Sequence, residues 1–212
     1  MTQSGWVPVA LSAMIEAGTS AGVVVDGAEI VVWRDISGKA HAWEDRCPHR
    51  GMKMSFGFVR GDHIACLYHG WEYDESGNCQ YIPAHPDLEV PKSICISRYG
   101  VAETGGMIWA HVPLGSEAGA APELAEAEGL RSLYVDASVA AVASALGSDV
   151  SGSMLTVSTA DVALSIGVQP ISDTQCALHV TVPMGTSVEE KNAVLDWCEA
   201  LRRQVENSEA MA

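Results

Sequence analysis

The 212-residue sequence lacks several features that would place it in common classes of protein. It has no run of about 18 apolar residues, so we expect no membrane-spanning helix. The first residues, Met1-Thr2-Gln3-Ser4-Gly5-Trp6, contain no basic or apolar segment, so we expect no signal peptide. Basic residues are scarce, with 12 Lys and Arg against 27 Asp and Glu, and the net charge of −15 argues against a nucleic-acid partner. These absences predict a cytoplasmic globular protein with reduced thiols, and its acidic surface favours solubility or the steering of a redox partner.

Histidine is almost missing from the second half of the chain. Residues 116–212 contain only His179, whereas the first half contains His41, His49, His63, His69, His85 and His111. The second half is also the more acidic, with 4 basic and 14 acidic residues, against 8 and 13 in residues 1–115. We expect His179 to be a structural strand residue rather than a metal ligand, and His63 and His85 to be loop residues rather than proton relays.

Short β-rich runs separated by Gly and Asp turns dominate the first half. The strongest hairpin signal is Gly22–Arg34, where two apolar runs flank Asp26-Gly27. The other predicted strands are Trp6–Ala10, Ala40–Glu44, Ile64–Leu67, Glu72–Tyr73, Ile94–Ser97 and Met107–Val112. Residues 1–115 are therefore predicted to form a small all-β domain, an antiparallel sandwich.

The composition changes after this series of strands. Residues 116–129 lie in a stretch rich in Ala, Glu and Gly, which is typical of a linker. Residues 130–212 are predicted to form a small α+β domain of antiparallel strands with one long C-terminal helix. The expected strands are Leu130–Val135, Met154–Thr159, Val162–Val168 and Ala177–Val182, with a short helix capped by Asp136 and ended by Gly147.

The C-terminal helix has the clearest pattern in the chain. Ser187 and Glu190 have the spacing of a capping box, which predicts that the helix begins there. Apolar residues then recur at a spacing of three to four, at Val194, Leu195, Cys198, Leu201 and Val205. One face of this helix is therefore expected to pack on the strands.

The chemistry is carried by a pair of short motifs in the first half. Cys47-Pro48-His49 is followed by sixteen residues and then by Cys66-Leu67-Tyr68-His69. Two thiolates can hold one iron of a [2Fe–2S] cluster and two imidazoles can hold the other, as in clusters of Rieske type. Such clusters have potentials of about −150 to +300 mV, against about −400 mV for all-cysteine plant-type clusters. The candidate ligands are therefore Cys47, His49, Cys66 and His69.

Zinc is the competing metal. Zinc sites of the Cys₂His₂ type usually pair Cys with Cys and His with His. Here each motif mixes one Cys with one His, as expected if each loop gives one ligand to each iron.

Gly51 and Gly70 follow the two motifs, where tight turns would bring backbone amides near sulfur. Nearby, Trp71 is expected to be a core aromatic, while Arg50 and Lys53 are either surface charges or partner contacts. Cysteines 79, 95, 176 and 198 have no ligand spacing and are expected to be mainly buried small apolar residues.

Residues 6–112 resemble the N-terminal Rieske domain of bacterial ring-hydroxylating and demethylating oxygenases. The matching segments are Trp33-Arg34-Asp35, Glu44–Gly51, Cys66–Asp74, Gly77 and Ile82-Pro83. This resemblance implies that the two cysteines hold a buried iron and the two histidines an outer iron, whose edges exchange electrons. The sequence departs from the family at Leu67, where the family usually has proline.

The resemblance also indicates the class of cluster. Rieske proteins of respiratory complexes have an additional cysteine in each ligand loop, and the two form a disulfide. The equivalent residues here are Met52 and Tyr68, which cannot form one. We therefore predict a potential near the low end of the Rieske range.

The second half resembles the family only weakly. Val162–Val182 and the final helix are similar to the last strands and closing helix of the oxygenase helix-grip domain, as in a truncated version of it. The family's catalytic iron is held by two histidines and one carboxylate, and its Asp-x-x-His-x₄-His motif is absent here. We therefore predict a [2Fe–2S] cluster and no mononuclear iron in this chain.

Three functions follow from these observations. The first is an electron-transfer protein that accepts electrons from a flavin- or ferredoxin-type reductase. The second is a subunit of a hetero-oligomeric oxygenase whose catalytic iron lies on a partner chain. The third is a redox-sensing module for binding or assembly, which uses the α+β half. The resemblance also implies an oligomer, because the subunits of oxygenases in this family assemble into rings.

Overall fold

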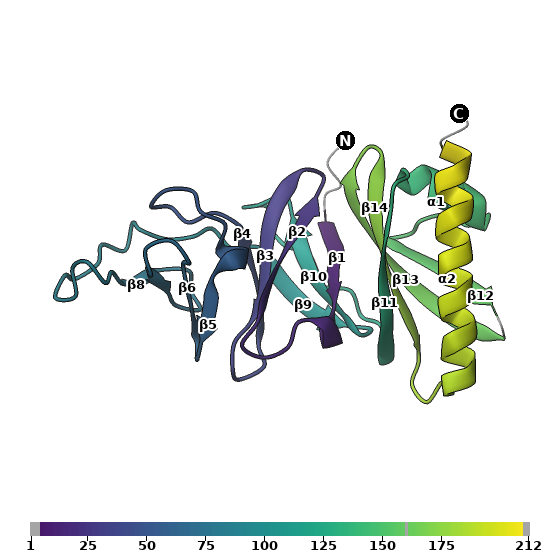
Figure 1. The fold of residues 1–212 in the computed structure, drawn as a ribbon, viewed down its shortest axis with the longest axis horizontal. Coiled ribbons are helices and arrows are strands. Elements are labelled where there is room, and N and C mark those ends of the chain that lie inside the picture. The colour runs from purple at the N-terminus through teal and green to yellow at the C-terminus, as the bar shows by residue number, and fades with distance from the viewer. Residues whose placement is uncertain (1–4, 160, 210–212) are drawn as a thin grey trace.

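The computed structural model describes residues 5–159 and 161–209, which form four antiparallel sheets and two α-helices (Figure 1). The first half contains a three-stranded sheet of β1 (Gly5–Leu11), β10 (Met107–Val112) and β9 (Gly100–Thr104). A second three-stranded sheet contains β2 (Ser20–Val25), β3 (Ala28–Arg34) and β4 (Ala40–Glu44). A four-stranded sheet contains β5 (Phe58–Arg60), β6 (His63–Ala65), β7 (Glu72–Tyr73) and β8 (Cys79–Tyr81). Short 3₁₀ turns occur at Ser12–Met14 and Met54–Phe56.

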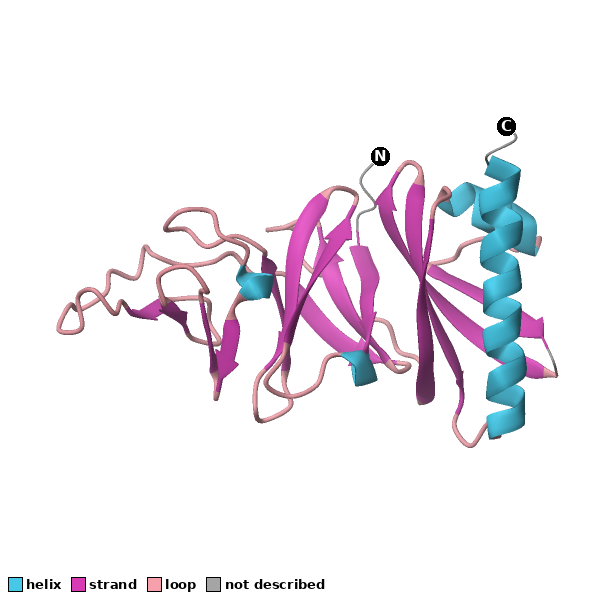
Figure 2. Cartoon of the chain, viewed as in Figure 1, coloured by secondary structure: helices cyan, strands magenta, loops and turns pink. Residues whose placement is uncertain are grey.

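The second half contains one larger sheet and both α-helices. Its strand order is β11 (Ala127–Val135), β14 (Gln175–Pro183), β13 (Val162–Ser172) and β12 (Met154–Thr159). The helices are α1 (Val139–Leu146) and α2 (Val188–Glu209), and Figure 2 shows α2 lying along the sheet at one end of the molecule. The predicted fold class, antiparallel β structure followed by strands with one long C-terminal helix, is confirmed. Among the described residues, no helix is long and apolar enough to cross a membrane.

The two three-stranded sheets share one apolar core. Val23, Ile30, Ile108 and Ala110 are buried in it, and each comes from a strand on which apolar side chains face inward. The β2–β3 hairpin turns at Asp26-Gly27, where both residues have positive φ, as a tight two-residue hairpin requires. This hairpin prediction is confirmed, although β2 begins at Ser20 rather than at Gly22.

A separate core lies beneath the four-stranded sheet. Trp33, Trp43, Met54 and Tyr73 are fully buried there, and two of the candidate ligands, both cysteines, belong to the same cluster. The side chains of β3 and β4 alternate, so that Val32 faces the first core and its neighbours Val31 and Trp33 face this one. One face of the β3–β4 pair therefore packs in the first core, and the other face packs in the second.

The helix α2 closes a third core against the C-terminal sheet. Val194, Cys198, Leu201 and Val205 are buried against the inward side chains of β13 and β14. The predicted capping box is present, because Ser187 Oγ accepts from the Glu190 N–H and Glu190 Oε2 accepts from the Ser187 N–H.

The two halves are joined where β13 crosses the N-terminal sheets. Gly167 lies there, and a Cβ on this residue would come 2.5 Å from Met107 Sδ and 2.8 Å from Pro8 Cγ. Further along β13, the Pro170 and Ile171 carbonyls accept hydrogen bonds from the backbone of the β2–β3 turn. The absence of a side chain at Gly167 thus lets two sheets approach closely.

Three local predictions were wrong. Ile94–Ser97 is not a strand, since Cys95 forms only an isolated bridge with Asn78. The N-cap of α1 is Ser138, whose side chain accepts from the Ala141 N–H, rather than Asp136. Asp136 instead accepts from the side chain of Gln175 on a neighbouring strand. The strand β11 begins at Ala127, inside the stretch predicted to be a linker.

Candidate cluster site and its relatives

Two loops at the tip of the four-stranded sheet carry the candidate ligands. The first loop follows β4 and the second joins β6 to β7. They have the same backbone pattern: Gly51 N–H donates to the Cys47 carbonyl and Cys47 N–H to the Met52 carbonyl. In the second loop, Gly70 N–H donates to the Cys66 carbonyl and Cys66 N–H to the Trp71 carbonyl. The two motifs therefore fold as matching tight loops.

Glycine is required at one position of each loop. Gly51 has φ +73° and Gly70 has φ +68°, a left-handed conformation that other residues rarely adopt. A Cβ at Gly70 would also come 3.1 Å from Pro83 Cγ, so the chain after β8 packs directly on this loop. The predicted tight turns are present, and the reason for glycine is conformational.

The four candidate ligand side chains lie as two pairs. The Cys47 and Cys66 side chains are buried in the same core, and neither forms a disulfide. The imidazoles of His49 and His69 lie side by side, with ring centroids 4.6 Å apart. His49 is half-buried and His69 is exposed. The arrangement places sulfur on the inside and imidazole on the outside.

The sulfur atoms are surrounded by hydrogen-bond donors. The Cys66 thiol, the Tyr73 hydroxyl at 3.2 Å and the backbone N–H groups of His49 and Arg50 together lower the pKa of Cys47, against the opposing effect of burial. The pKa of Cys66 is raised by its bond to Cys47 and by burial, although the Tyr68 and His69 amides act in the opposite direction. These donors stabilise negative charge on the Cys47 sulfur.

Aromatic residues enclose the histidine pair. Trp71 stacks on His49 with ring centroids 4.2 Å apart and an interplanar angle of 4°, and it packs partly against the core. The expectation that Trp71 is a core aromatic therefore omitted its contact with a candidate ligand. Tyr73 was missed as a sulfur partner, although its place in the short strand Glu72–Tyr73 implied that one of these two side chains faces inward.

Residues 5–92 match the protein family described as the Rieske [2Fe-2S] domain. This part of the chain is a Rieske domain. Its cofactor is a Rieske-type [2Fe–2S] cluster. The donor set fits that group, because two buried cysteine sulfurs lie beside a hydroxyl donor and loop amides, and two adjacent imidazoles lie nearer the surface.

Curated relatives match about half of the chain. The oxidoreductase NdmD of Pseudomonas putida is 37% identical over 105 residues, which is 49% of this chain and 18% of the relative. The 3-chlorobenzoate-3,4-dioxygenase oxygenase subunit of Comamonas testosteroni is 34% identical over 109 residues, which is 50% of this chain and 25% of the relative. The matched stretch thus spans a quarter or less of each of these relatives.

Solved structures resemble the whole chain. Apo dicamba monooxygenase superposes with a TM-score of 0.79 at 18% identity, covering 99% of this chain and 87% of that one. At this identity the likeness shows the fold alone. It extends past the Rieske domain, so the sheet of β11–β14 with α2 also has a counterpart there.

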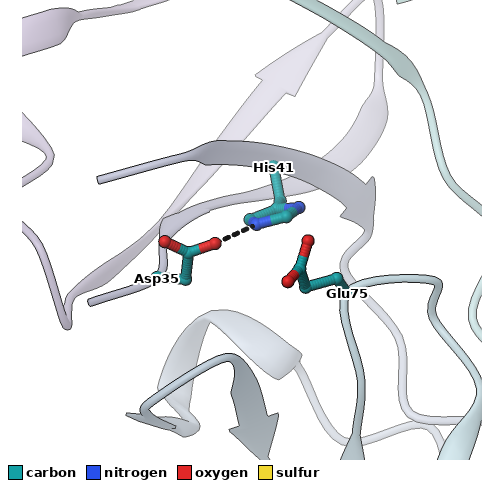
Figure 3. Close-up of side chains that lie close together, drawn as sticks. All are labelled: Asp35, His41 and Glu75. Atoms are coloured by element: carbon teal, nitrogen blue, oxygen red, sulfur yellow. Dashed lines mark hydrogen bonds and ion pairs between the residues drawn. The ribbon is translucent and has the colours of Figure 1, made fainter. Parts of the chain in front are cut away.

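A second polar cluster lies beside the Rieske domain's inner core. Asp35 follows β3, His41 lies on β4 and Glu75 lies in the turn before β8, with one ligand-type atom of each within 4.8 Å of the others (Figure 3). Burial would raise the pKa of Asp35, but bonds from His41, Ser37 and the Lys39 amide hold it at about 2.

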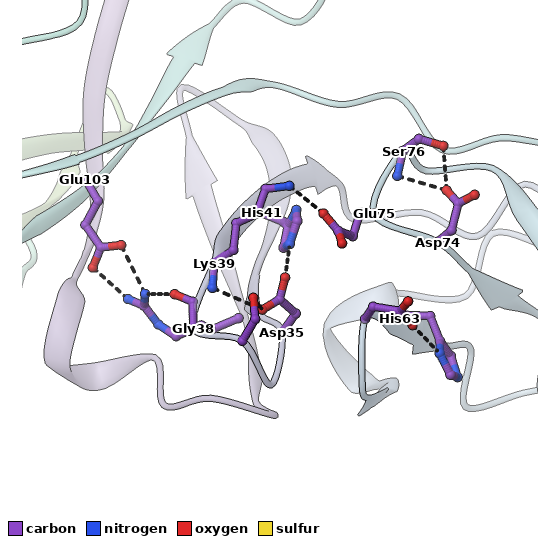
Figure 4. Close-up of polar contacts among 12 residues, drawn as sticks. Asp35, Gly38, Lys39, His41, His63, Asp74, Glu75, Ser76 and Glu103 are labelled. Carbon is purple, nitrogen blue, oxygen red and sulfur yellow. Dashed lines mark hydrogen bonds and ion pairs between the residues drawn. The ribbon is translucent and has the colours of Figure 1, made fainter.

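The internal bonds of this cluster indicate a structural clamp. Burial lowers the pKa of His41, so the imidazole is neutral and its Nε2 donates to Asp35 Oδ2 at 3.0 Å. His41 also stacks on Trp33, with ring centroids 4.1 Å apart. Lys39 forms an ion pair with Glu75, which ties the β7–β8 turn to the β3–β4 hairpin (Figure 4). Asp35, His41, Lys39 and Glu75 are therefore paired with one another, and these contacts link the four-stranded sheet to the β3–β4 hairpin.

His63 and His179 have local partners. His63 lies on β6 rather than in a loop, 3.2 Å from an oxygen of Asp62 and 3.5 Å from one of Glu72. His179 is a buried residue of β14, as expected for a structural role. Its Nδ1 lies 2.8 Å from Ser132 Oγ and its Nε2 lies 2.8 Å from Gln169 Oε1.

Proposed function

We propose that this chain is a Rieske-type electron-transfer protein that passes single electrons from a flavin- or ferredoxin-type reductase to an oxygenase-type acceptor. Its cluster ligands are Cys47 and Cys66 on one iron and His49 and His69 on the other. When bound, the cluster supplies one-electron redox chemistry. The observation that carries the proposal is the pair of matching loops, with both sulfurs buried and both imidazoles toward the surface.

The protein's own groups divide into two roles. Inside, the Tyr73 hydroxyl and the loop amides donate to sulfur, which stabilises negative charge there. Outside, the His69 ring is exposed, so an electron can enter or leave without the partner contacting the buried iron site. The Trp71 ring covers one face of His49 and fixes the orientation of that imidazole.

The second half supports an acceptor on another chain. A facial triad needs two histidines and one carboxylate, and residues 116–212 offer only His179. Burial lowers the pKa of His179 to about 4, and both of its ring nitrogens are hydrogen-bonded to protein groups. His179 is therefore occupied as a structural residue.

A second candidate function is a subunit of a hetero-oligomeric oxygenase. The fold likeness to apo dicamba monooxygenase, which covers 99% of this chain, favours it. In that case this chain delivers its electron to an iron on a partner chain. Co-purification with a non-haem iron protein, and loss of that protein's activity without this chain, would distinguish the two candidates.

The ligand assignment is tested with matched cysteine variants. The purified protein should contain two irons and two sulfides per chain and give a rhombic EPR signal of low average g after reduction by dithionite. Cys66→Ser should lose this signal, whereas Cys79→Ser, at another buried cysteine of the same core, should retain it. A Cys66→Ser protein with the full signal would contradict the ligand assignment.

The electron-transfer role has its own test. The reduced protein should be reoxidised by an oxygenase-type acceptor and should not hydroxylate a substrate with reductase alone. Substrate hydroxylation by the purified chain, or a third EPR-distinct iron, would refute the role. We also propose a potential near the low end of the Rieske range, and a value well above about 0 mV would contradict that part.

A further inference from the structure

The C-terminal sheet has an open edge at β12. This strand pairs only with β13, and it lies at the edge of the sheet opposite β11 (Figure 1). Its sequence, Met154–Thr159, contains no charged residue and no proline. Proteins usually protect an exposed edge strand with such residues, because unpaired backbone groups at an edge bind other strands. The β12 edge is therefore suited to pairing with another strand.

The opposite edge of the same sheet is protected by charge. The strand β11 carries Glu128 and Arg131, which form ion pairs with Lys191 and Glu199 of α2. Along β12, within the part of the chain that the structure describes, only Ser151 forms a backbone bridge on the outer side. The two edges therefore differ, and β12 is the one left open to a partner strand.

The direction of the backbone groups on β12 follows from the hydrogen bonds at its start. Met154 exchanges both of its backbone hydrogen bonds with Ser151, which lies outside the sheet. The preceding residue, Ser153, accepts through its carbonyl from Val168 of β13. Along an antiparallel strand, successive residues direct their N–H and C=O groups to opposite neighbours. The even-numbered residues of β12 therefore direct these groups outward, away from β13.

Thr156 and Ser158 are the even-numbered residues that follow Met154. Both side chains are exposed, and Val157 between them is half-buried. Within residues 5–159 and 161–209, neither Thr156 nor Ser158 forms a hydrogen bond beyond the β12–β13 pair. Each residue thus offers one N–H and one C=O to a partner strand.

A second copy of β12 fits these groups. A two-fold axis at Val157 would place Thr156 opposite the copy's Ser158, and Ser158 opposite the copy's Thr156. Each of these pairs can exchange two hydrogen bonds, so that every outward group of the two residues is used. Val157 would then face its own copy in the non-hydrogen-bonded position, where side chains approach most closely. A register centred on Thr156 would instead place Ser158 opposite Met154, whose outward groups are already bonded to Ser151.

We propose that β12 is a dimerisation edge, at which two copies of this chain pair antiparallel about Val157. The two four-stranded sheets then form one continuous sheet. The contact is isologous, unlike the head-to-tail contacts that build a ring. The two-fold axis is perpendicular to the joined sheet, so both α2 helices lie on one face and both Rieske domains on the other (Figure 1). This inference is independent of the electron-transfer role.

Sedimentation equilibrium of the cluster-loaded protein measures the association. The mass should rise with concentration from that of one chain, 22.4 kDa, towards that of two. Ser158→Pro removes an outward N–H and places a ring at the edge, so the association constant should fall by about tenfold or more. Ser158→Ala keeps the N–H and should associate like the wild type.

The association should become stronger as salt is added. Residues 116–212 contain 4 basic and 14 acidic residues, so pairing brings two negatively charged halves together. Salt screens this repulsion, and it does not weaken a contact made by backbone hydrogen bonds and uncharged side chains. A dimer that dissociates at high ionic strength would be held by ion pairs elsewhere, and that result would overturn the proposal.

Disulfide crosslinking tests the register. The variants are made in a Cys95→Ser background, which removes the exposed native thiol. Val157→Cys should give a disulfide-linked dimer on mild oxidation, because the Cα atoms of the facing residues would lie about 4.5 Å apart. Thr156→Cys should not, because its copy would be displaced by about 7 Å along the strands. Each variant must keep the wild-type EPR signal and thermal unfolding.

The outcomes separate this inference from the proposed function. A chain that stays monomeric at every concentration, a trimer, or a dimer that Ser158→Pro leaves intact would overturn the proposal. If Ser158→Pro does not fold, the crosslinking decides, and no disulfide in Val157→Cys or equal yields in Val157→Cys and Thr156→Cys would overturn it. None of these results changes the rhombic EPR signal or the reoxidation assay, and loss of that signal would refute the proposed function instead.

Discussion

Replacing Tyr73 by phenylalanine is expected to lower the potential of the cluster. The Tyr73 side chain is fully buried and its hydroxyl lies 3.2 Å from Cys47 Sγ. Burial and the neighbouring thiol raise the pKa of Tyr73, so the hydroxyl keeps its proton and donates it to sulfur. The reduced cluster is the more negative state, so this bond is stronger after reduction. Tyr73→Phe removes the donor and leaves the ring in place.

The size of the shift follows from the strength of one hydrogen bond. A bond to a charged acceptor contributes about 1.5–3 kcal/mol, and we take about 1 kcal/mol of this as the difference between the two redox states. For a one-electron couple about 59 mV corresponds to about 1.4 kcal/mol. The potential should therefore fall by about 40 mV.

The measurement is a redox titration followed by EPR or visible absorbance. Tyr99→Phe is the matched control, because Tyr99 is also a buried tyrosine but belongs to the core between the two three-stranded sheets. Its potential should equal that of the wild type. An unchanged or higher potential in Tyr73→Phe, with the cluster content intact, would show that the hydroxyl does not donate to sulfur.

Three further predictions concern stability. The pKa of His179 is about 4 in the folded protein and about 6.5 in the unfolded chain. Its contribution to the free energy of unfolding is therefore complete above pH 6.5 and is lost as the pH falls towards 4. Urea unfolding should show that the free energy of unfolding falls by about 3 kcal/mol over this pH range. In His179→Gln the free energy of unfolding should depend less on pH. The same pH dependence in His179→Gln and the wild type would contradict the prediction. Gly167→Ala should cost about 2 kcal/mol, because the new Cβ would meet Met107 Sδ at 2.5 Å, whereas Gly119→Ala should be neutral. Ser187→Ala should cost about 1 kcal/mol by removing the capping box, and Ser187→Thr should restore most of it, as measured by thermal unfolding.

The cluster motif and its loops could be predicted because their signals are local. Each motif places its donors within four residues, and each glycine is required by a left-handed turn inside the same loop. The capping box at Ser187 is local in the same sense. These features depend on residues that are neighbours in sequence, so tertiary contacts had little influence on them.

The missed features depend on contacts between distant segments. The bond between Tyr73 and Cys47 joins residues 26 apart, and the pairing of Asp136 with Gln175 joins residues 39 apart. Ile94–Ser97 has the apolar content of a strand, but within the described residues it forms only an isolated bridge through Cys95. Composition could not reveal that no complete partner strand lies beside it.

A chain of polar residues links the N-terminal sheets to the second sheet. Gln169 Nε2 donates to the Val24 carbonyl across the junction, which leaves its Oε1 to accept from His179 Nε2. Ser132 then donates to Nδ1, so each of these buried groups is satisfied. A buried polar group in this chain without its hydrogen-bond partner would destabilise the fold. A shift of β13 along β2 would break the hydrogen bond between Gln169 and the Val24 carbonyl. The sheet of β5–β8 and the helix α2 lie at opposite ends of the long axis (Figure 1), with this hydrogen-bonded chain at the junction between them.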